Sequence, residues 1–258
     1  MNVRRVTVLS AAAVVCACAA PRIDTAAPAR GVPGFDTRDY PGNAAMRAWF
    51  GSSPYRWVGY YLPAPCYTGT TWTGRRAALR DIGWGFAVLY VGEQDWRATG
   101  RAAANQPAAE DPRCSSAHLT EEQGRLHADA AAAAAAADGF PARTVIFLDV
   151  ERVDRVSPEL ATYVRSWVEG VLDGGRYTPG LYAHDINVER LYAIVAEEFA
   201  NRQRPDRAPL WVAHTRGFDV RSAPGESGYA AALIWQGVLN TREEWSGTAL
   251  NIDVNVSA

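Results

Sequence analysis

Two acidic residues, Asp149 and Glu151, stand two positions apart at the end of an apolar stretch, residues 144–151. The stretch has the length and the branched-residue content of a buried β-strand. Because side chains alternate along a strand, both carboxyl groups project from one face, with their Cβ atoms about 6.5 Å apart. One carboxyl of such a pair can donate a proton while the other stabilises positive charge. The alternative is a structural pair that caps a helix or binds an arginine such as Arg152 or Arg155.

The remaining sequence contains the elements that would hold this pair. Apolar runs predict eight strands, at residues 34–37, 56–62, 85–92, 144–151, 179–184, 209–214, 231–236 and 250–256. Helical patterns occur between most of them, at residues 43–50, 73–82, 120–137, 157–171 and 186–202. This alternation, over 258 residues, predicts an α/β protein with parallel pairing: a (β/α)8 TIM-type barrel, irregular in its last third. An open doubly wound sheet is the alternative, but the chain lacks the Gly-rich first turn of such folds.

Chemically useful side chains recur at the carboxyl ends of the predicted strands, which surround the active site in a barrel of this kind. Four are acids: Asp36, Asp149, Glu151 and Asp253. Six more are candidates for binding a substrate: Tyr61, Tyr90, Tyr182, His214, Trp235 and Gln236. Tyr60 is the alternative to Tyr61, and His184 the alternative to Tyr182. Singly, Tyr90 and Tyr182 are more often core tyrosines, His184 and His214 hydrogen-bonded strand-end residues, and Asp253 a cap or turn residue. Their convergence at one end of the barrel is typical of a sugar site.

Five segments carry a family resemblance, in the order residues 35–37, 147–151, 210–213, 234–236 and 252–255. They resemble the family 25 glycoside hydrolases, the lysozyme-like muramidases, and more closely a glycoside-hydrolase-like domain family of exported actinobacterial proteins. The resemblance covers roughly residues 31–257. It implies that Glu151 is the proton donor and Asp149 its partner. It also implies that Asp36 and Asp253 stabilise an oxocarbenium-like or oxazolinium-like state, with a substrate N-acetyl group acting as nucleophile in the latter case.

Together these features predict an exported glycoside hydrolase-like protein that acts on an N-acetylated cell-wall glycan, peptidoglycan first, with Glu151 as general acid. No cofactor and no metal are expected. The alternative is a barrel that keeps the site without the chemistry, as a glycan-binding or cell-wall regulatory module. Two departures from the muramidases favour this alternative: Gly237 replaces their usual aromatic, and Asp-Thr-Arg-Asp replaces their Asp-x-Ser. A third reading is a hydrolase for another envelope linkage, such as an arabinan or galactan.

Residues 1–20 have the layout of an export signal, in which Arg4 and Arg5 precede an apolar run. The adjacent arginines resemble a twin-arginine signal, which exports folded proteins; an ordinary secretory signal is the alternative. Residues 15–18 also resemble a weak lipobox that would carry a lipid on Cys18. Residues 21–31 are expected to form a flexible spacer, and residues 32–258 the barrel. No other segment approaches the ~20 apolar residues that span a bilayer, so an extracellular or cell-wall location is expected.

The net charge and the cysteine content limit which classes of binding partner and which cross-links we expect. The net charge is −2, and it becomes −4 without Arg4 and Arg5. A negative net charge is not typical of a protein that binds nucleic acid. Beyond residue 20 only Cys66 and Cys114 remain, and an even pair in an exported protein favours a disulfide. Two free thiols are the alternative. A bridge would hold the long loop after the third strand over the barrel mouth. We expect a monomer.

Overall fold

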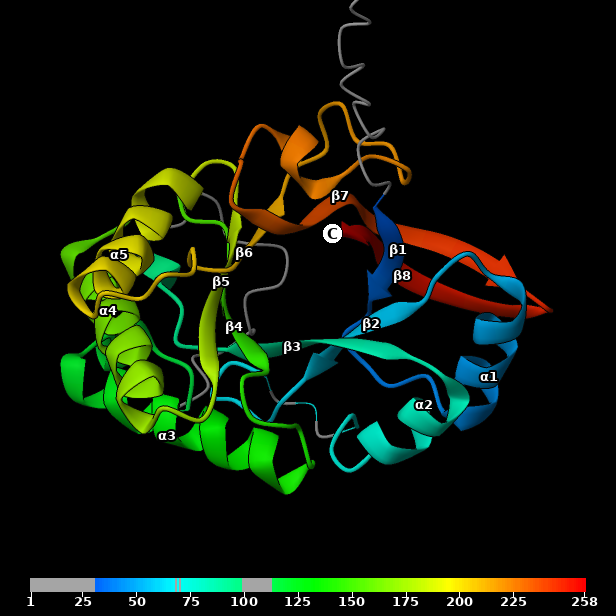
Figure 1. Cartoon of the computed structure of the whole chain (residues 1–258), viewed down its shortest axis with the longest axis horizontal. Helices are drawn as coiled ribbons and strands as arrows, with labels where there is room; N and C mark the ends of the chain where they lie inside the picture. Colours follow the sequence, from blue (N-terminus) through cyan, green and yellow to red (C-terminus); the bar gives the residue numbers. More distant parts are fainter. Residues whose placement is uncertain (1–30, 68, 70, 99–112) are drawn as a thin grey trace, which may run out of the picture.

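The computed structural model describes residues 31–67, 69, 71–98 and 113–258. Eight strands close into a barrel in sequence order (Figure 1), which confirms the predicted (β/α)8 TIM-type fold. The strands are β1 (Val32–Asp36), β2 (Trp57–Tyr61), β3 (Gly85–Val91), β4 (Val145–Val150), β5 (Thr178–His184), β6 (Leu210–Ala213), β7 (Ala232–Trp245) and β8 (Thr248–Ser257). The predicted export signal, Cys18 and spacer residues 21–30 lie outside the described residues.

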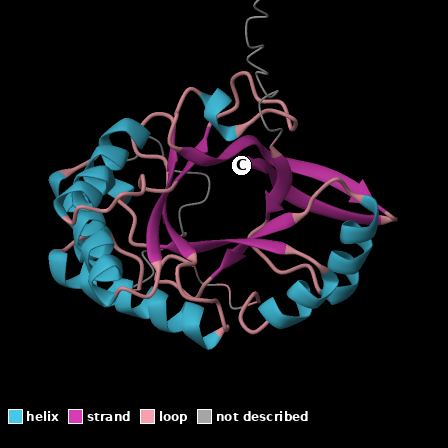
Figure 2. Ribbon diagram, viewed as in Figure 1, coloured by secondary structure: helices cyan, strands magenta, loops and turns pink. Residues whose placement is uncertain are grey.

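In the described ranges, five α-helices cover the outside of the barrel (Figure 2). They are α1 (Asn43–Ser52), α2 (Arg76–Ile82), α3 (Glu121–Ala137), α4 (Pro158–Gly174) and α5 (Val188–Asn201). The start of α3 is fixed by the Thr120 side chain, which accepts a hydrogen bond from Gln123 N, and α4 begins in the same way at Ser157. Within the described part of the chain only a short 3-10 helix, η3 (Pro224–Ser227), follows β6, so the last third is irregular as predicted.

The direction of the last strand corrects the expectation of parallel pairing throughout. Strands β1 to β7 pair in parallel, but β8 is antiparallel to both β7 and β1. The reason is the two-residue turn between β7 and β8, where Ser246 and Gly247 have φ values of 49° and 73°. Positive φ at both positions is the mark of a tight hairpin turn, which reverses the chain instead of crossing over. The hairpin projects beyond the barrel wall in Figure 1.

The barrel core has two layers, and the alternation predicted for β4 is confirmed. Ile146, Leu148 and Val150 pack outward against the helices, while Phe147 belongs to a separate cluster inside the barrel. Trp211 is fully buried in this inner cluster, where its ring meets Trp57, Phe147 and Tyr182 edge to face at 5.6–5.8 Å. The interior is therefore packed with aromatic side chains, and the acidic residues lie at the ends of the strands. None of the helices in the described ranges is long and apolar enough to cross a membrane.

Candidate active site

Asp36, Gln236 and Asp253 form the centre of the acidic cluster. Asp36 ends β1 and lies directly opposite Asp253 on β8. The amide Nε2 of Gln236, on β7, donates to Asp36 Oδ2 at 2.9 Å and to Asp253 Oδ2 at 3.2 Å. Because β8 runs in the reverse direction, Asp253 reaches this end of the barrel from the middle of its strand. Three strands thus bring two carboxyl groups to one amide.

Asp36 is a buried hydrogen-bond acceptor. It is 5% exposed and accepts hydrogen bonds from Tyr61 Oη, Gln236 Nε2 and Asn255 Nδ2 at 2.8–2.9 Å. Burial raises the pKa of Asp36, and the three donors oppose that rise. Trp211 Nε1 can only donate, and it donates to Asn255 Oδ1 at 3.0 Å, so the Asn255 amide must turn its nitrogen toward Asp36. The aromatic core therefore fixes the hydrogen bonding of this acid.

Gly59, on β2, leaves the space that Asp36 occupies. A Cβ atom added at Gly59 would lie 2.5 Å from the Asp36 Cβ. We expect Gly59→Ala to displace Asp36 and to lower the free energy of unfolding by about 1–3 kcal/mol, because overpacking a rigid core costs about that much. Urea denaturation measures the loss. Gly51→Ala is the matched control, since a Cβ there meets nothing within 4 Å in helix α1; equal stabilities for both variants would contradict this role of Gly59.

Asp149 is a buried acid without a hydrogen bond to one of its oxygens. It is 6% exposed, and among the described residues its Oδ1 has no partner. Burial, followed by the charges of Glu151, Asp36 and Asp253, raises the pKa of Asp149 well above its ordinary value. Burial and the charge of Asp36 likewise raise the pKa of Asp253 to about 7. These shifts are typical of functional carboxyl groups.

The alternative of a structural acid pair bound to arginine finds no support in the contacts. In the described ranges, every ion pair of an arginine is made with an acid other than Asp36, Asp149, Glu151 or Asp253. Without an arginine counter-ion, burial and mutual repulsion together raise the pKa of Asp149 and Asp253. A positive charge or an N–H group on a ligand would relieve this repulsion at this end of the barrel.

Glu151 combines an accessible side chain with a firmly held backbone. Its side chain is 47% exposed and lies 3.5 Å from His184, measured between Oε2 and Nε2. Glu151 N donates to Gln94 Oε1 at 2.9 Å, and the carbonyl oxygen of Glu151 accepts from Asn187 Nδ2 at 3.1 Å. Gln94 Nε2 also donates to the carbonyl of Asp149 at 2.8 Å. Gln94 and Asn187 lie outside the predicted site, because no periodic pattern marks a residue that acts on another strand's backbone.

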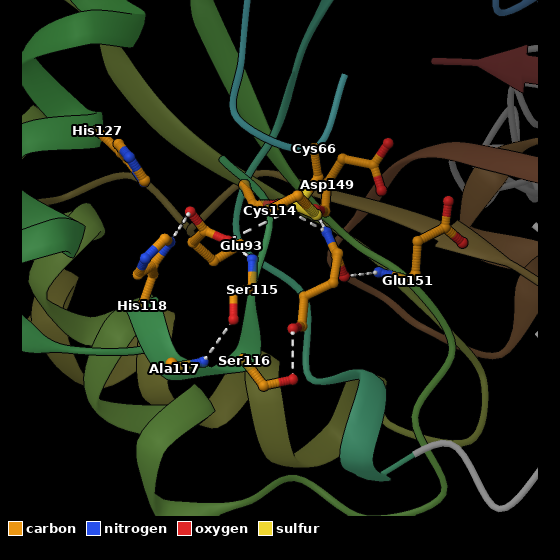
Figure 3. Close-up of a disulfide and its surroundings, with 12 residues drawn as sticks. Cys66, Glu93, Cys114, Ser115, Ser116, Ala117, His118, His127, Asp149 and Glu151 are labelled. Atoms are coloured by element: carbon orange, nitrogen blue, oxygen red, sulfur yellow. Dashed lines mark hydrogen bonds and ion pairs between the residues drawn. A yellow bond between two sulfur atoms is a disulfide. The ribbon is translucent and has the colours of Figure 1, made fainter. Parts of the chain in front are cut away.

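The disulfide predicted between Cys66 and Cys114 is confirmed, with a Cα–Cα distance of 4.8 Å. The bridge lies beside Glu93 and near Asp149 and Glu151 (Figure 3). Ser115, next to the bridge, donates its backbone N–H to Glu93 at 2.8 Å, and the hydroxyl of Ser116 donates to the carbonyl of Gln94 at 3.2 Å. The bridge therefore holds the loop that contacts the residues supporting Glu151.

One group in the described part of the chain has the spacing of metal ligands. It consists of Cys66, Glu93 and Cys114. Its two sulfur atoms are bonded to each other, so neither is a thiolate that could bind a metal. The acidic cluster is not among such groups of described residues, because its carboxyl oxygens do not come together at ligand spacing.

The structure does not bring all the predicted binding residues to the acids. Tyr61, Tyr182 and Gln236 point inward, as expected. Tyr90, by contrast, packs outside the barrel against Trp167, and Trp235 stacks on His214 at 5.1 Å in the outer layer. The reason is strand alternation. Leu89, Ala213 and Ile234 occupy the inner face, so the next residue on each strand points outward. Asn255, on β8, contacts Asp36 instead.

A closed α/β barrel with an acidic cluster at the strand ends is compatible with a glycoside-hydrolase-like protein. Residues 47–257 match the family described as "Rv2525c-like, glycoside hydrolase-like domain", and the chain belongs to this family. No curated protein sequence matches it.

Three solved structures share the fold at low sequence identity. An uncharacterised protein of B. stearothermophilus has a TM-score of 0.57 and 19% identity, over 88% of this chain and 96% of that one. The Clostridium perfringens spore cortex lytic enzyme SleM has a TM-score of 0.56 and 14% identity, over 90% and 68% of the two chains. The Mycobacterium tuberculosis Tat-secreted protein Rv2525c, in complex with L-tartrate, has a TM-score of 0.52 and 16% identity, over 88% and 95%.

Proposed function

We propose that this protein is an exported hydrolase of an N-acetylated cell-wall glycan, with peptidoglycan as its substrate and Glu151 as the general acid. The observation that carries the proposal is the contrast between the two acids at the end of β4. Glu151 is half-exposed on a firmly held backbone, whereas Asp149 is buried beside Asp36 and Asp253. One carboxyl is thus available to exchange a proton with a ligand, and the others form a buried acidic cluster beside it. Membership of a glycoside-hydrolase-like family agrees with this division of roles.

The proposed reaction uses the substrate's own N-acetyl group. Glu151 gives its proton to the glycosidic oxygen as the bond from that oxygen to C1 breaks, and the acetamido oxygen forms a bond to C1. The acidic cluster of Asp36, Asp149 and Asp253 balances the positive charge of the oxazolinium ion. Water then attacks C1 and gives a proton to the Glu151 carboxylate, while the bond from C1 to the acetamido oxygen breaks. The products are two sugar chains, one with a new reducing end.

Export is part of the proposal. Residues 1–20 resemble a twin-arginine signal, and the Cys66–Cys114 disulfide is the type of bond that persists outside the cytoplasm. A protein that folds before it crosses the membrane would arrive with Cys66 and Cys114 already side by side, and the bridge would close outside the cytoplasm. Fusion of residues 1–31 to a reporter that requires twin-arginine export tests this part separately.

Replacement of Glu151 by glutamine tests the catalytic claim. The wild-type protein, without residues 1–31, is expected to release reducing ends from purified peptidoglycan and from oligomers of β-1,4-linked N-acetylglucosamine. Glu151→Gln is expected to lower this rate about 10²–10⁴-fold, because the amide cannot donate the proton to the leaving oxygen. Glu122→Gln is the matched control, since Glu122 is exposed on α3. Equal release by wild type and Glu151→Gln contradicts the claim, and binding of the glycans without any release assigns a glycan-binding function instead.

A further inference from the structure

The His184 side chain faces the carboxyl group of Glu151. It ends β5, next to the strand that carries Asp149 and Glu151, and its side chain is 14% exposed. Its Nε2 lies 3.5 Å from Glu151 Oε2 and also 3.5 Å from the Tyr182 hydroxyl. One ring nitrogen thus faces two oxygen atoms. What it can do for Glu151 depends on whether this nitrogen carries a hydrogen.

The neighbouring hydrogen bonds decide that question, starting from Asp36. Asp36 accepts from three donors, one of which is Gln236 Nε2, so the Gln236 amide turns its nitrogen toward the acids. The Gln236 oxygen then faces Tyr182, whose hydroxyl donates to it at 2.7 Å. An amide oxygen has no hydrogen to give, so the single hydrogen of the Tyr182 hydroxyl is committed to Gln236.

The series of hydrogen bonds continues from Tyr182 to His184. With its hydrogen committed, the Tyr182 oxygen can only accept from His184, so Nε2 must be the nitrogen that carries the hydrogen. The same N–H faces the Glu151 carboxyl. Both distances are long, as is usual for catalytic contacts without substrate, which shorten when the ligand is bound.

We propose that His184 is a positioning residue that donates its Nε2–H to Glu151 when Glu151 loses its proton to the leaving group. The inference rests on the proposed function and deepens it. Negative charge develops on Glu151 as the glycosidic bond breaks, and a donor already aimed at its oxygen stabilises that charge. The chain from Asp36 through Gln236 and Tyr182 holds the donor in place. The acid at the end of β1 thereby sets the hydrogen bond made to the acid that follows β4.

The first test needs no substrate. In the ¹⁵N spectrum of the wild-type protein at alkaline pH, the neutral His184 ring is expected to carry its hydrogen on Nε2, with His184→Phe identifying the signal. The Nε2 resonance is expected to shift when Glu151 is replaced by glutamine. A hydrogen on Nδ1 overturns the proposal, and so does an Nε2 resonance that stays at the same frequency in Glu151→Gln. This result stands whether or not the protein cleaves a glycan.

The second test separates positioning from a merely structural role. Two probes are compared, a pentasaccharide of β-1,4-linked N-acetylglucosamine and an aryl glycoside of the trisaccharide, whose phenolic leaving group needs little help from an acid. His184→Phe is expected to lower kcat for the pentasaccharide about 10–100-fold, the worth of a hydrogen bond to a charged group, and to spare the aryl glycoside. His184→Gln, which keeps an N–H donor, is expected to recover part of the loss. Equal losses of kcat on both probes overturn the positioning role of His184. If the wild-type protein cleaves neither probe, the proposed function fails, and the ¹⁵N spectrum alone decides whether His184 donates to Glu151.

Discussion

Asp149→Asn is expected to raise the free energy of unfolding at neutral pH by about 1–3 kcal/mol and to abolish glycan hydrolysis. The gain arises because the wild-type carboxyl is buried with one oxygen unpaired and three other carboxyls nearby. Asparagine has the same shape, carries no charge, and offers an amide N–H to those neighbours. The loss arises because an amide cannot balance a positive intermediate. Residues kept for activity at the expense of stability are expected in active sites.

The pH dependence of this gain follows from the direction of the pKa shifts. The unfolded chain releases the Asp149 and Asp253 protons near the ordinary aspartate pKa of about 4. The folded chain retains these protons to higher pH, because the pKa is about 7 for Asp253 and well above the ordinary value for Asp149. The stability from these protons is therefore complete below about pH 4 and is lost as the pH rises toward the folded values. Urea denaturation should show the Asp149→Asn advantage at pH 7 and little at pH 4.

Asp36→Asn is the matched comparison, with the opposite sign. Asp36 accepts hydrogen bonds from Tyr61, Gln236 and Asn255, and an asparagine nitrogen would face one of these donors. We expect this variant to be less stable than the wild type by about 1–3 kcal/mol, because a buried donor loses its acceptor. If Asp149→Asn is destabilised to the same extent as Asp36→Asn, the picture of an unpaired, strained Asp149 is wrong.

Removal of the Cys66–Cys114 bridge is the second large effect. The double variant Cys66→Ser/Cys114→Ser is expected to lose about 2–4 kcal/mol of stability, because the bridge closes a loop of 48 residues and limits the freedom of the unfolded chain. For a chain of this size that is a fall in Tm of roughly 5–15 °C. Calorimetry of the variant beside the wild type measures it, with the chemically reduced wild type as an independent check.

Loss of the bridge is also expected to lower activity, because its loop contacts Gln94, which binds the backbone of Glu151. Ser115 holds Glu93, and Ser116 holds Gln94, whose amide fixes the backbone on both sides of Val150. We expect kcat to fall about tenfold in the double variant well below its Tm, since small displacements of an acid are costly. A variant that is less stable but fully active would limit the bridge to a stabilising role.

The sequence alone determined the fold class and the acidic part of the site. The stretch at residues 144–151 ends in two acids two positions apart, and in the structure they lie close enough for the charge of Glu151 to raise the pKa of Asp149. The pairing of Cys66 with Cys114 followed because the two residues remained once the predicted signal was set aside. Capping residues such as Thr120 and Ser157 fixed helix starts for equally local reasons.

Only the tertiary structure decided which face the other strand-end residues occupy. Both faces of β3 are apolar, so nothing in the local pattern says that Leu89 points into the barrel and Tyr90 out of it. The same holds for His214 and Trp235. The antiparallel course of β8 depends on one two-residue turn, and it determines how Asp253 meets Asp36. The roles of Gln94, Asn187 and His184 exist only through partners on other strands, because hydrogen bonds between distant segments follow from closure of the barrel and leave no periodic trace in the chain.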